Sequence, residues 1–237
     1  MTNIMMKQMQ QSVCALAVLA ATTLPAMAES VDVRVIGTIT PAACTPTLSG
    51  GGTIDYGAIN PTTLSVTDYT VLPEREVSLA ITCDAPAKVA ITPVNGRPGT
   101  VAGATESGGG GALTPVPLLS LTGAGVVGLG LSNGQKVGGY AMKVEDLTTD
   151  GAPADVIRTA LGATGWQADG NHYGFFRNVG TIPFQVTAAA PGTLVPEAFT
   201  TLAGKLRVQA YLNKTSELDV SSPVTLDGLT TIELVYL

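Results

Sequence analysis

The sequence predicts an all-β protein, a sandwich of short strands. Charged residues make up only 13% of the chain, about half the share in an ordinary soluble protein, and 28 of the 237 residues are glycine. Valine and threonine are frequent, and short apolar–polar alternations are separated by turns that contain Gly or Pro. Only one stretch has a helical pattern, so we expect strands and long turns to make up nearly all of the fold.

Residues 1–28 have the pattern of a secretory signal peptide. Lys7 precedes an apolar run over Val13–Leu24, and Ala26-Met27-Ala28 is a small-x-small cleavage site. The run is too short to be a stable membrane anchor, which is the alternative interpretation. No other stretch is long enough to span a bilayer, so we expect no transmembrane segment in the mature chain. Removing 28 of 237 residues leaves 209, a length that suits one β domain over residues 44–237 behind an N-terminal arm over residues 29–43.

The arm opens with a strict alternation. Val31, Val33, Val35, Gly37 and Ile39 share one phase, whereas Asp32 and Arg34 fall on the other. Successive strand side chains point to opposite faces, so the first set forms one apolar edge. Such an arm can fold back onto its own domain or insert into another one.

Further strands follow from the same alternation. In the first half we expect them over Thr53–Ile59, Glu76–Cys83 and Lys88–Val94, the last weakened by Pro93. In the second half we expect an apolar strand near Val116–Leu121 within a glycine-rich region, and a helix over Ala154–Leu161. The remaining expected strands are Lys136–Leu147, His172–Val179, Ile182–Ala190, Lys205–Leu212 and Leu229–Leu237.

The mature chain keeps two cysteines, Cys44 and Cys83. Cys83 shares a face with the apolar residues of its strand, so it points into a core where Cys44 can meet it. An even pair in an exported protein predicts a disulfide, and two free buried thiols are the alternative.

Catalytic and metal-binding patterns are weak. Gly123, Gly125 and Gly128 match the spacing of a dinucleotide-binding loop, but the glycine and Ser-Asn-Gly that follow cannot continue the helix such a site needs. His172 is the only histidine, so neither a Ser-His-Asp triad nor a histidine-rich metal site can be built. Without the leader, 11 basic residues face 18 acidic ones and none forms a basic patch, so we expect no nucleic-acid binding. We therefore expect no enzymatic activity, no catalytic residue, no metal and no cofactor.

Two carboxylate pairs and one aromatic cluster have both a functional and a structural interpretation. Glu74 with Glu76, and Asp146 with Asp150, are possible carboxylate pairs, but they lie beside turns, where solvated side chains are the simpler explanation. Trp166 and the Tyr173-Gly174-Phe175-Phe176 run can line a sugar-binding face or fill a core that has few other aromatic residues. We expect core packing.

Motifs at the two ends carry a family resemblance. A signal peptide is followed by an alternating arm that ends in Ile39-Thr40-Pro41-Ala42-Ala43-Cys44, then by Tyr56-Gly57-Ala58-Ile59 and the strand that ends at Cys83. The C-terminal run Ile232-Glu233-Leu234-Val235-Tyr236-Leu237 alternates and has a penultimate tyrosine. In their order and spacing these features resemble pilin subunits of bacterial chaperone–usher fimbriae. The long mature chain and the late Gly228 indicate a divergent, β-fimbria-type or pilin-like branch.

The resemblance implies a fold and a mode of assembly. Such subunits are immunoglobulin-like β-sandwiches that lack their last strand, and each inserts its N-terminal donor strand into the groove of a neighbour. On this basis Val31, Val33, Val35, Gly37 and Ile39 form the donor strand. Ile232, Leu234, Tyr236 and Leu237 belong to the C-terminal strand that a periplasmic chaperone first binds. The implied partners are that chaperone, an outer-membrane usher and neighbouring fimbrial subunits, on a route through the periplasm to the cell surface.

Three functional hypotheses follow. The first is a structural subunit of a fimbria that serves surface adhesion. The second is a tip adhesin or a non-polymerising pilin-like interaction protein. The third is a secreted enzyme or a small-ligand-binding β-sandwich, against which the lack of a catalytic pattern counts.

Overall fold

A computed structural model describes residues 32–38, 42–121, 123–170 and 173–237. The chain divides into two units, Met1–Thr40 and Pro41–Leu237, which are described separately. In the first unit, residues 32–38 are assigned to no helix or strand and are exposed. The predicted signal peptide lies outside the described residues, as do Val31 and Ile39.

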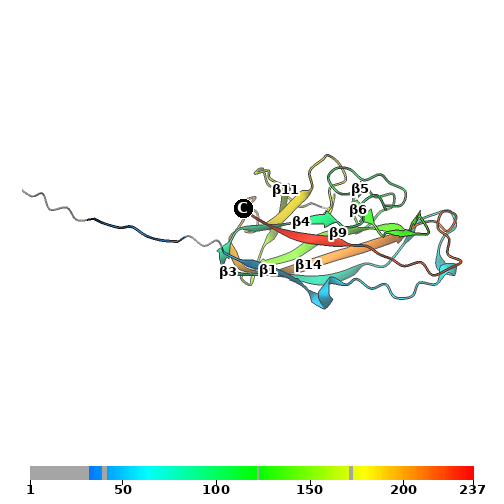
Figure 1. The fold of residues 1–237 in the computed structure, drawn as a ribbon, viewed down its shortest axis with the longest axis horizontal. Coiled ribbons are helices and arrows are strands. Elements are labelled where there is room, and N and C mark those ends of the chain that lie inside the picture. Colours follow the sequence, from blue (N-terminus) through cyan, green and yellow to red (C-terminus); the bar gives the residue numbers. More distant parts are fainter. Residues whose placement is uncertain (1–31, 39–41, 122, 171–172) are drawn as a thin grey trace, which may run out of the picture. The chain divides into compact units, whose positions relative to one another are not determined.

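The second unit is all-β, and every pair of neighbouring strands in it is antiparallel (Figure 1). Its larger sheet has the order β1-β3-β14-β9-β6-β5, with β10 paired to β9 and β2 paired to β14. The strands of this sheet are β1 (Cys44–Leu48), β2 (Thr70–Val71), β3 (Arg75–Ala87), β5 (Ala112–Leu113), β6 (Gly125–Gly128), β9 (Gly138–Thr149), β10 (Ala152–Pro153) and β14 (Phe199–Leu212).

The second sheet has five strands in the order β12-β11-β13-β4-β15. Its strands are β4 (Val89–Asn95), β11 (Asp155–Ala160), β12 (Gln167–Ala168), β13 (Phe184–Ala189) and β15 (Thr230–Tyr236). A separate hairpin joins β7 (Leu131–Ser132) to β8 (Gln135–Lys136), and two short 3-10 turns, η1 (Ser49–Gly52) and η2 (Pro61–Thr63), follow β1. Asn133 and Gly134 both have positive φ, which is the backbone that a two-residue hairpin turn requires.

The core lies between the two sheets. Alternate residues of β3, β9 and β14 in the larger sheet and of β4 and β13 in the smaller one form one buried cluster. In β3 this alternation is strict, because Val77, Leu79, Ile81 and Cys83 are buried and the residues between them are more exposed. In β9 and β14 the expected phases are also buried, but the alternation is not strict, because Ala141 and Tyr211 on the other phase are buried in a second cluster.

Four predicted elements are wrong. Ala154–Leu161 is not a helix, because its residues pair with β13 and β12 as strand β11. Thr53–Ile59 is not a strand: Ile54 and Tyr56 are half-buried between exposed neighbours as an alternation requires, and Ile59 is half-buried out of phase, but no described strand pairs with the segment. Val116–Leu121 is mainly a turn, in which Leu119 and Ser120 have positive φ.

The fourth wrong prediction is the strand His172–Val179. Outside His172, which the structure does not describe, this segment is irregular and has one isolated bridge, at Arg177. Phe175 and Phe176 lie in the core, each 1% exposed, so the predicted core packing is confirmed for these two rings. The glycine repeat at 123–128 contributes strand β6 rather than a nucleotide-binding loop. A side chain at Gly125 would lie 2.1 Å from the Phe176 carbonyl oxygen, so close packing explains this glycine.

Candidate functional site

The smaller sheet ends in a strand with an unpaired edge. Among the described residues β15 pairs with β4 alone. The Gly96 N–H donates to the Leu229 carbonyl (2.9 Å) and the Leu237 N–H donates to the Lys88 carbonyl (3.0 Å), so the odd-numbered residues of β15 face β4 in hydrogen-bonded pairs. The backbone N–H and C=O groups of the even-numbered residues, from Thr230 to Tyr236, therefore point to the open side. This edge can pair with another strand.

A groove lies beside this edge, and we call it the C-terminal groove. Two cavities that share Leu226 make it up, with volumes of about 420 and 450 Å³. One rim is the segment 49–64 that follows β1, and the other is the segment 218–229 that leads into β15; neither contains a strand. The lining is mainly apolar, with core residues as its floor: Val77, Leu129, Val137, Tyr140, Met142, Leu206, Val208, Ala210 and Leu212.

Both rims bury alternate apolar side chains without belonging to a sheet. Ile54 and Tyr56 are half-buried on the first rim, and Val220, Val224 and Leu226 are half-buried on the second. No described strand fills the space between the rims. The floor residues are each at most 8% exposed, so the two rims already shield this part of the core, and a further strand would occupy the apolar space that remains between them.

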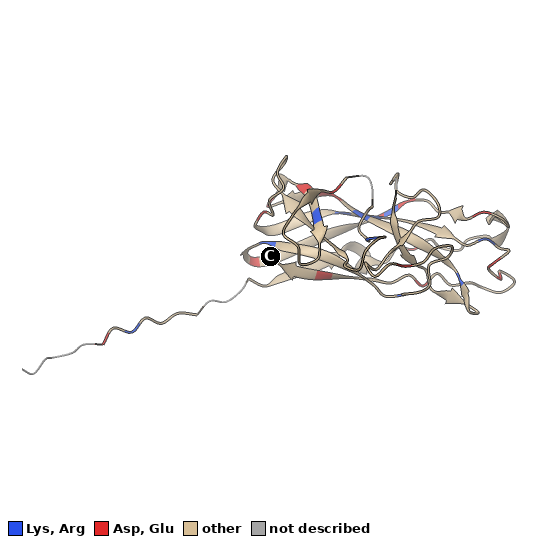
Figure 2. Ribbon diagram, turned by 90° about the horizontal axis from the view of Figure 1, so that it is seen from above, with Lys and Arg blue, Asp and Glu red and all other residues tan. Residues whose placement is uncertain are grey.

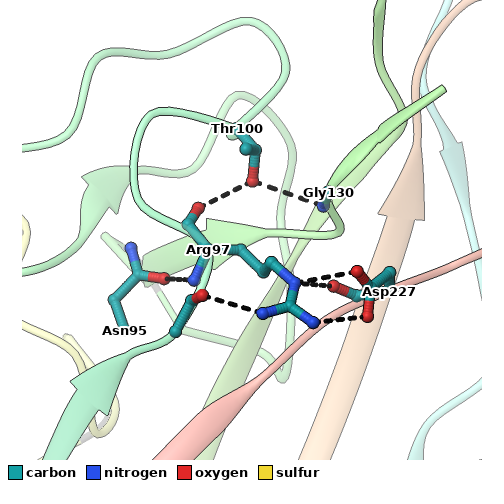
Figure 3. Close-up of polar contacts among 6 residues, drawn as sticks. Asn95, Arg97, Thr100, Gly130 and Asp227 are labelled. Atoms are coloured by element: carbon teal, nitrogen blue, oxygen red, sulfur yellow. Dashed lines mark hydrogen bonds and ion pairs between the residues drawn. The ribbon is translucent and has the colours of Figure 1, made fainter. Parts of the chain in front are cut away.

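The entry to β15 is held by a clasp of Arg97 and Asp227 (Figure 3). The Arg97 guanidinium donates to both carboxylate oxygens of Asp227, at 2.7 and 2.9 Å, and to its carbonyl at 3.0 Å. The backbone N–H of Arg97 donates to Asn95 Oδ1. The Thr100 hydroxyl donates to the backbone carbonyl of Arg97 and accepts from the backbone N–H of Gly130. The hydrogen bond from Arg97 lowers the pKa of the Asp227 carboxyl below its ordinary value.

Two contacts with Tyr140 place the start of β15 on the groove floor. The hydroxyl oxygens of Tyr140 and Thr230 are hydrogen-bonded at 2.6 Å, and burial raises the pKa of Tyr140 to about 12. Gly228 lies against the same ring, because a Cβ there would be 2.8 Å from Tyr140 Cε1. The glycine before the last strand therefore allows close approach to the core.

The predicted disulfide is confirmed. Cys44 and Cys83 are bonded, face each other across β1 and β3, and are 39 residues apart in the chain. The Cys44 N–H donates to the Tyr236 hydroxyl at 2.8 Å, so the beginning of β1 is tied to the end of β15. The disulfide and this hydrogen bond hold the two strands that flank the C-terminal groove.

The predicted C-terminal strand residues differ in burial. Ile232 and Leu234 pack against the core, whereas Tyr236, in the same phase, is 52% exposed and Leu237 is 48% exposed. Of the predicted donor-strand residues, Val33 is 86% and Val35 94% exposed, and nothing lies within 4 Å of a Cβ built on Gly37. Ile36, on the opposite phase of the arm, is 91% exposed. Sequence reasoning missed the rim 218–229, for which the alternate spacing of Val220, Val224 and Leu226 was the available sign.

The described lining of the groove contains no His, Cys, Asp, Glu, Lys or Arg. The described residues include no cluster of three or more His, Cys, Asp or Glu side chains able to hold a metal, and no helix long and apolar enough to cross a membrane. The four acids first considered as carboxylate pairs are bound elsewhere: Glu74 to Arg207, Glu76 and Asp146 to Lys205, and Asp150 to the backbone of Thr200 and Thr201. Figure 2 shows Lys and Arg dispersed over several elements. The chemistry available in the groove is therefore apolar burial together with backbone hydrogen bonding at β15.

One family model matches part of the chain, and two curated relatives match most of it. Residues 33–141 match the family model described as a protein of unknown function (DUF1120). Protein GltF of Escherichia coli K12 is 29% identical over 95% of this chain and 96% of its own length. The uncharacterized protein YhcF of the same organism is 28% identical over 88% of this chain and 90% of its own length. No solved structure matches the chain significantly.

Proposed function

We propose that the protein is a structural subunit of a bacterial fimbria, assembled by donor-strand exchange. In this proposal the domain is an incomplete, immunoglobulin-like β-sandwich whose C-terminal groove receives the N-terminal arm of the next copy. The observation that carries the proposal is the open edge of β15 beside a groove floored by core residues. A periplasmic chaperone occupies the groove first, and an outer-membrane usher directs the exchange at the cell surface.

The arm suits the groove in length and in pattern. Nine extended residues, Val31–Ile39, span about 30 Å, and the seven residues of β15 span about 24 Å, so the arm can pair along the whole strand. Its apolar phase would lie on the groove floor while Asp32 and Arg34 face water. Each buried Val or Ile contributes roughly 1.5–3 kcal/mol, so several in register make a stable joint. Head-to-tail insertion does not close on itself and yields an open fibre.

The test compares two changes on opposite faces of the arm. Val33→Asp places a charge on the groove floor, where burial is costly, whereas Ile36→Asp places the same charge on the solvent side. We expect Val33→Asp to abolish polymers on unheated denaturing gels when the protein is expressed with its chaperone and usher. Ile36→Asp should assemble, and both monomers should melt within about 1 °C of the wild type, because the arm contributes nothing to the isolated fold.

Two outcomes would refute the proposal. If Val33→Asp lowers the melting temperature of the monomer and causes no selective assembly defect, the arm is an ordinary first strand of its own domain. If the wild-type protein forms no polymer with any copurifying chaperone and usher, a non-polymerising interaction protein becomes the better description.

A further inference from the structure

A third cavity lies in the smaller sheet, at the opposite end from β15. It has a volume of about 310 Å³ and lies among β11, β12, β13 and the segment before β13. This volume is at the lower end of the range for small-molecule sites. The lining is mixed rather than apolar: Arg158, Thr159, Ala160, Gly165, Gln167, Tyr173, Arg177, Val179 and Phe184.

Aromatic rings, not hydrogen bonds, orient the first arginine of the cavity. The Arg158 guanidinium carbon is 4.9 Å from the ring centroid of Tyr173 and 4.8 Å from that of Phe184. Arg158 is only 8% exposed, yet it donates no hydrogen bond that meets standard geometry to any residue in the described part of the chain. Because ring contacts use the faces of a guanidinium, its in-plane N–H groups other than those of Nη1, which lies 3.3 Å from Asp169 Oδ1, stay available to an oxyanion.

The second arginine is also incompletely bonded. The Arg177 guanidinium carbon is 5.3 Å from the Phe184 centroid, and its Nη1 donates to the Ile182 carbonyl at 3.0 Å. Its Nε is buried and has no hydrogen-bond partner among the described residues. Buried donors without partners are rare in folded proteins, so the Nε of Arg177 indicates a missing acceptor, whereas the Nη1 of Arg158 has the Asp169 carboxylate beside it.

One carboxylate limits the charge of that acceptor. Asp169 lies 3.3 Å from Arg158 Nη1, and both side chains are more than nine-tenths buried. Arg158, Arg177 and Asp169 together carry a net charge of +1, which a single carboxylate neutralises; Lys143, which also acts on Asp169, is ion-paired with Glu145. A doubly charged phosphate would leave an uncompensated charge beside Asp169, and burying such a charge is costly.

We propose that this cavity binds a small polyhydroxylated monocarboxylate, such as a hexuronate or another acidic monosaccharide. Its carboxylate accepts hydrogen bonds from Arg158 and Arg177. The Thr159 hydroxyl, which donates to the Gly165 carbonyl, accepts from a ligand hydroxyl, and the exposed Gln167 amide serves another. The inference is independent of the fimbrial proposal, because the cavity shares no residue with the C-terminal groove.

The chain carries its own fluorescence probe for this test. Trp166 is the only tryptophan and is flanked by Gly165 and Gln167, which line the cavity. Purified mature protein is titrated with glucuronate, glucose, acetate and inorganic phosphate, and isothermal titration calorimetry repeats each measurement. Glucose tests the hydroxyl groups alone, acetate the carboxylate alone and phosphate the dianion.

We expect glucuronate to bind at least about tenfold more tightly than the other three probes, because one charge-assisted hydrogen bond typically changes the affinity by about this factor. Arg177→Gln, at a half-buried position, should weaken glucuronate binding by at least about tenfold. The matched control is Arg75→Gln. Arg75 belongs to β3 of the larger sheet, and its guanidinium carbon is 5.7 Å from the Tyr56 ring centroid. This variant should bind glucuronate like the wild type. Thermal melting verifies that both variants are folded.

Three results would overturn the inference. Equal affinities for glucuronate and glucose would show that the arginines do not bind a carboxylate. Acetate or phosphate binding as tightly as glucuronate would exclude the proposed ligand class. Unchanged glucuronate affinity in folded Arg177→Gln protein would place any binding elsewhere.

Discussion

The two ends of the five-stranded sheet are finished in different ways. At one end β12 has two residues, so little backbone is left open for pairing. At the other end β15 has seven residues and one open side. Short edge strands are a common protection against unwanted strand pairing, whereas a long open edge invites it. One sheet therefore has both a protected end and an end able to take up another strand.

The cavities beside the two edge strands also differ in polarity. Beside β12 lie a buried ion pair, two arginines and a mixed cavity, which suit a small polar ligand. Beside β15 lies an apolar groove floored by the core, which suits an extended chain. An edge open to pairing with another strand is therefore confined to the β15 end of this sheet.

The largest expected effect comes from removing the open edge. Deleting Thr231–Leu237 takes away the strand that a chaperone would pair with and uncovers the core beneath Ile232 and Leu234. We expect loss of chaperone capture and of periplasmic accumulation, measured by copurification and by yield. The control is Ala168→Pro, at the other end of the same sheet. The Asp169 N–H donates to the Val156 carbonyl, so the N–H of the preceding residue, Ala168, points away from β11. Proline at this position therefore removes no hydrogen bond between strands. Normal yield of the truncated chain would contradict this role for β15.

A smaller effect is expected from the disulfide beside the groove. In the chain-entropy model, cross-linking residues 39 apart stabilises the fold by about 4 kcal/mol. Cys44→Ser/Cys83→Ser should therefore have a lower free energy of unfolding by that order in urea, and the reducing agent should change the wild type alone. Intact mass should show a loss of about two daltons in the non-reduced wild type, since forming the bond removes two hydrogens. Two alkylatable thiols in the native protein would contradict the bond.

The smallest effect concerns the protected end and depends on pH. Burial raises the pKa of Asp169 to about 6, and Arg158 and Lys143 oppose this shift. In the unfolded chain the carboxyl titrates near 4, so between about pH 4 and 6 the folded protein binds the additional proton. Stability should thus fall as pH rises through this window, by about 3 kcal/mol at most for a shift of this size.

Asp169→Asn removes that dependence, because the amide does not titrate. Urea unfolding at several pH values should show a flatter profile from pH 4 to 6 in the variant than in the wild type. The carboxyls of Asp150, Asp219 and Asp227 have lowered pKa values, so their contribution is lost as pH falls below about 4 and does not overlap this window. Parallel profiles in the two proteins would contradict a buried, ionised Asp169.

Strict alternation identified the strands that build the core. The apolar phases ending at Cys83 and at Leu212 are buried as expected, and the position of Cys83 in its phase brought it to Cys44. The same reasoning failed where tertiary pairing overrides local pattern. Ala154–Leu161 has residues that suit a helix, but β13 and β12 on its two sides offer backbone partners.

The sequence by itself determined which residues are apolar on alternate positions, and hence the all-β class, the core faces and the disulfide. The tertiary structure alone decided which alternating segments acquire partners. Thr53–Ile59 and Thr230–Tyr236 both alternate, yet one is an unpaired rim and the other a paired strand. The reason is physical: alternation records which side chains are buried, whereas pairing depends on whether another backbone lies within hydrogen-bonding distance. The arginine cavity follows the same rule, since Arg158, Asp169 and Arg177 are brought together only by the packing of β11, β12 and the segment before β13.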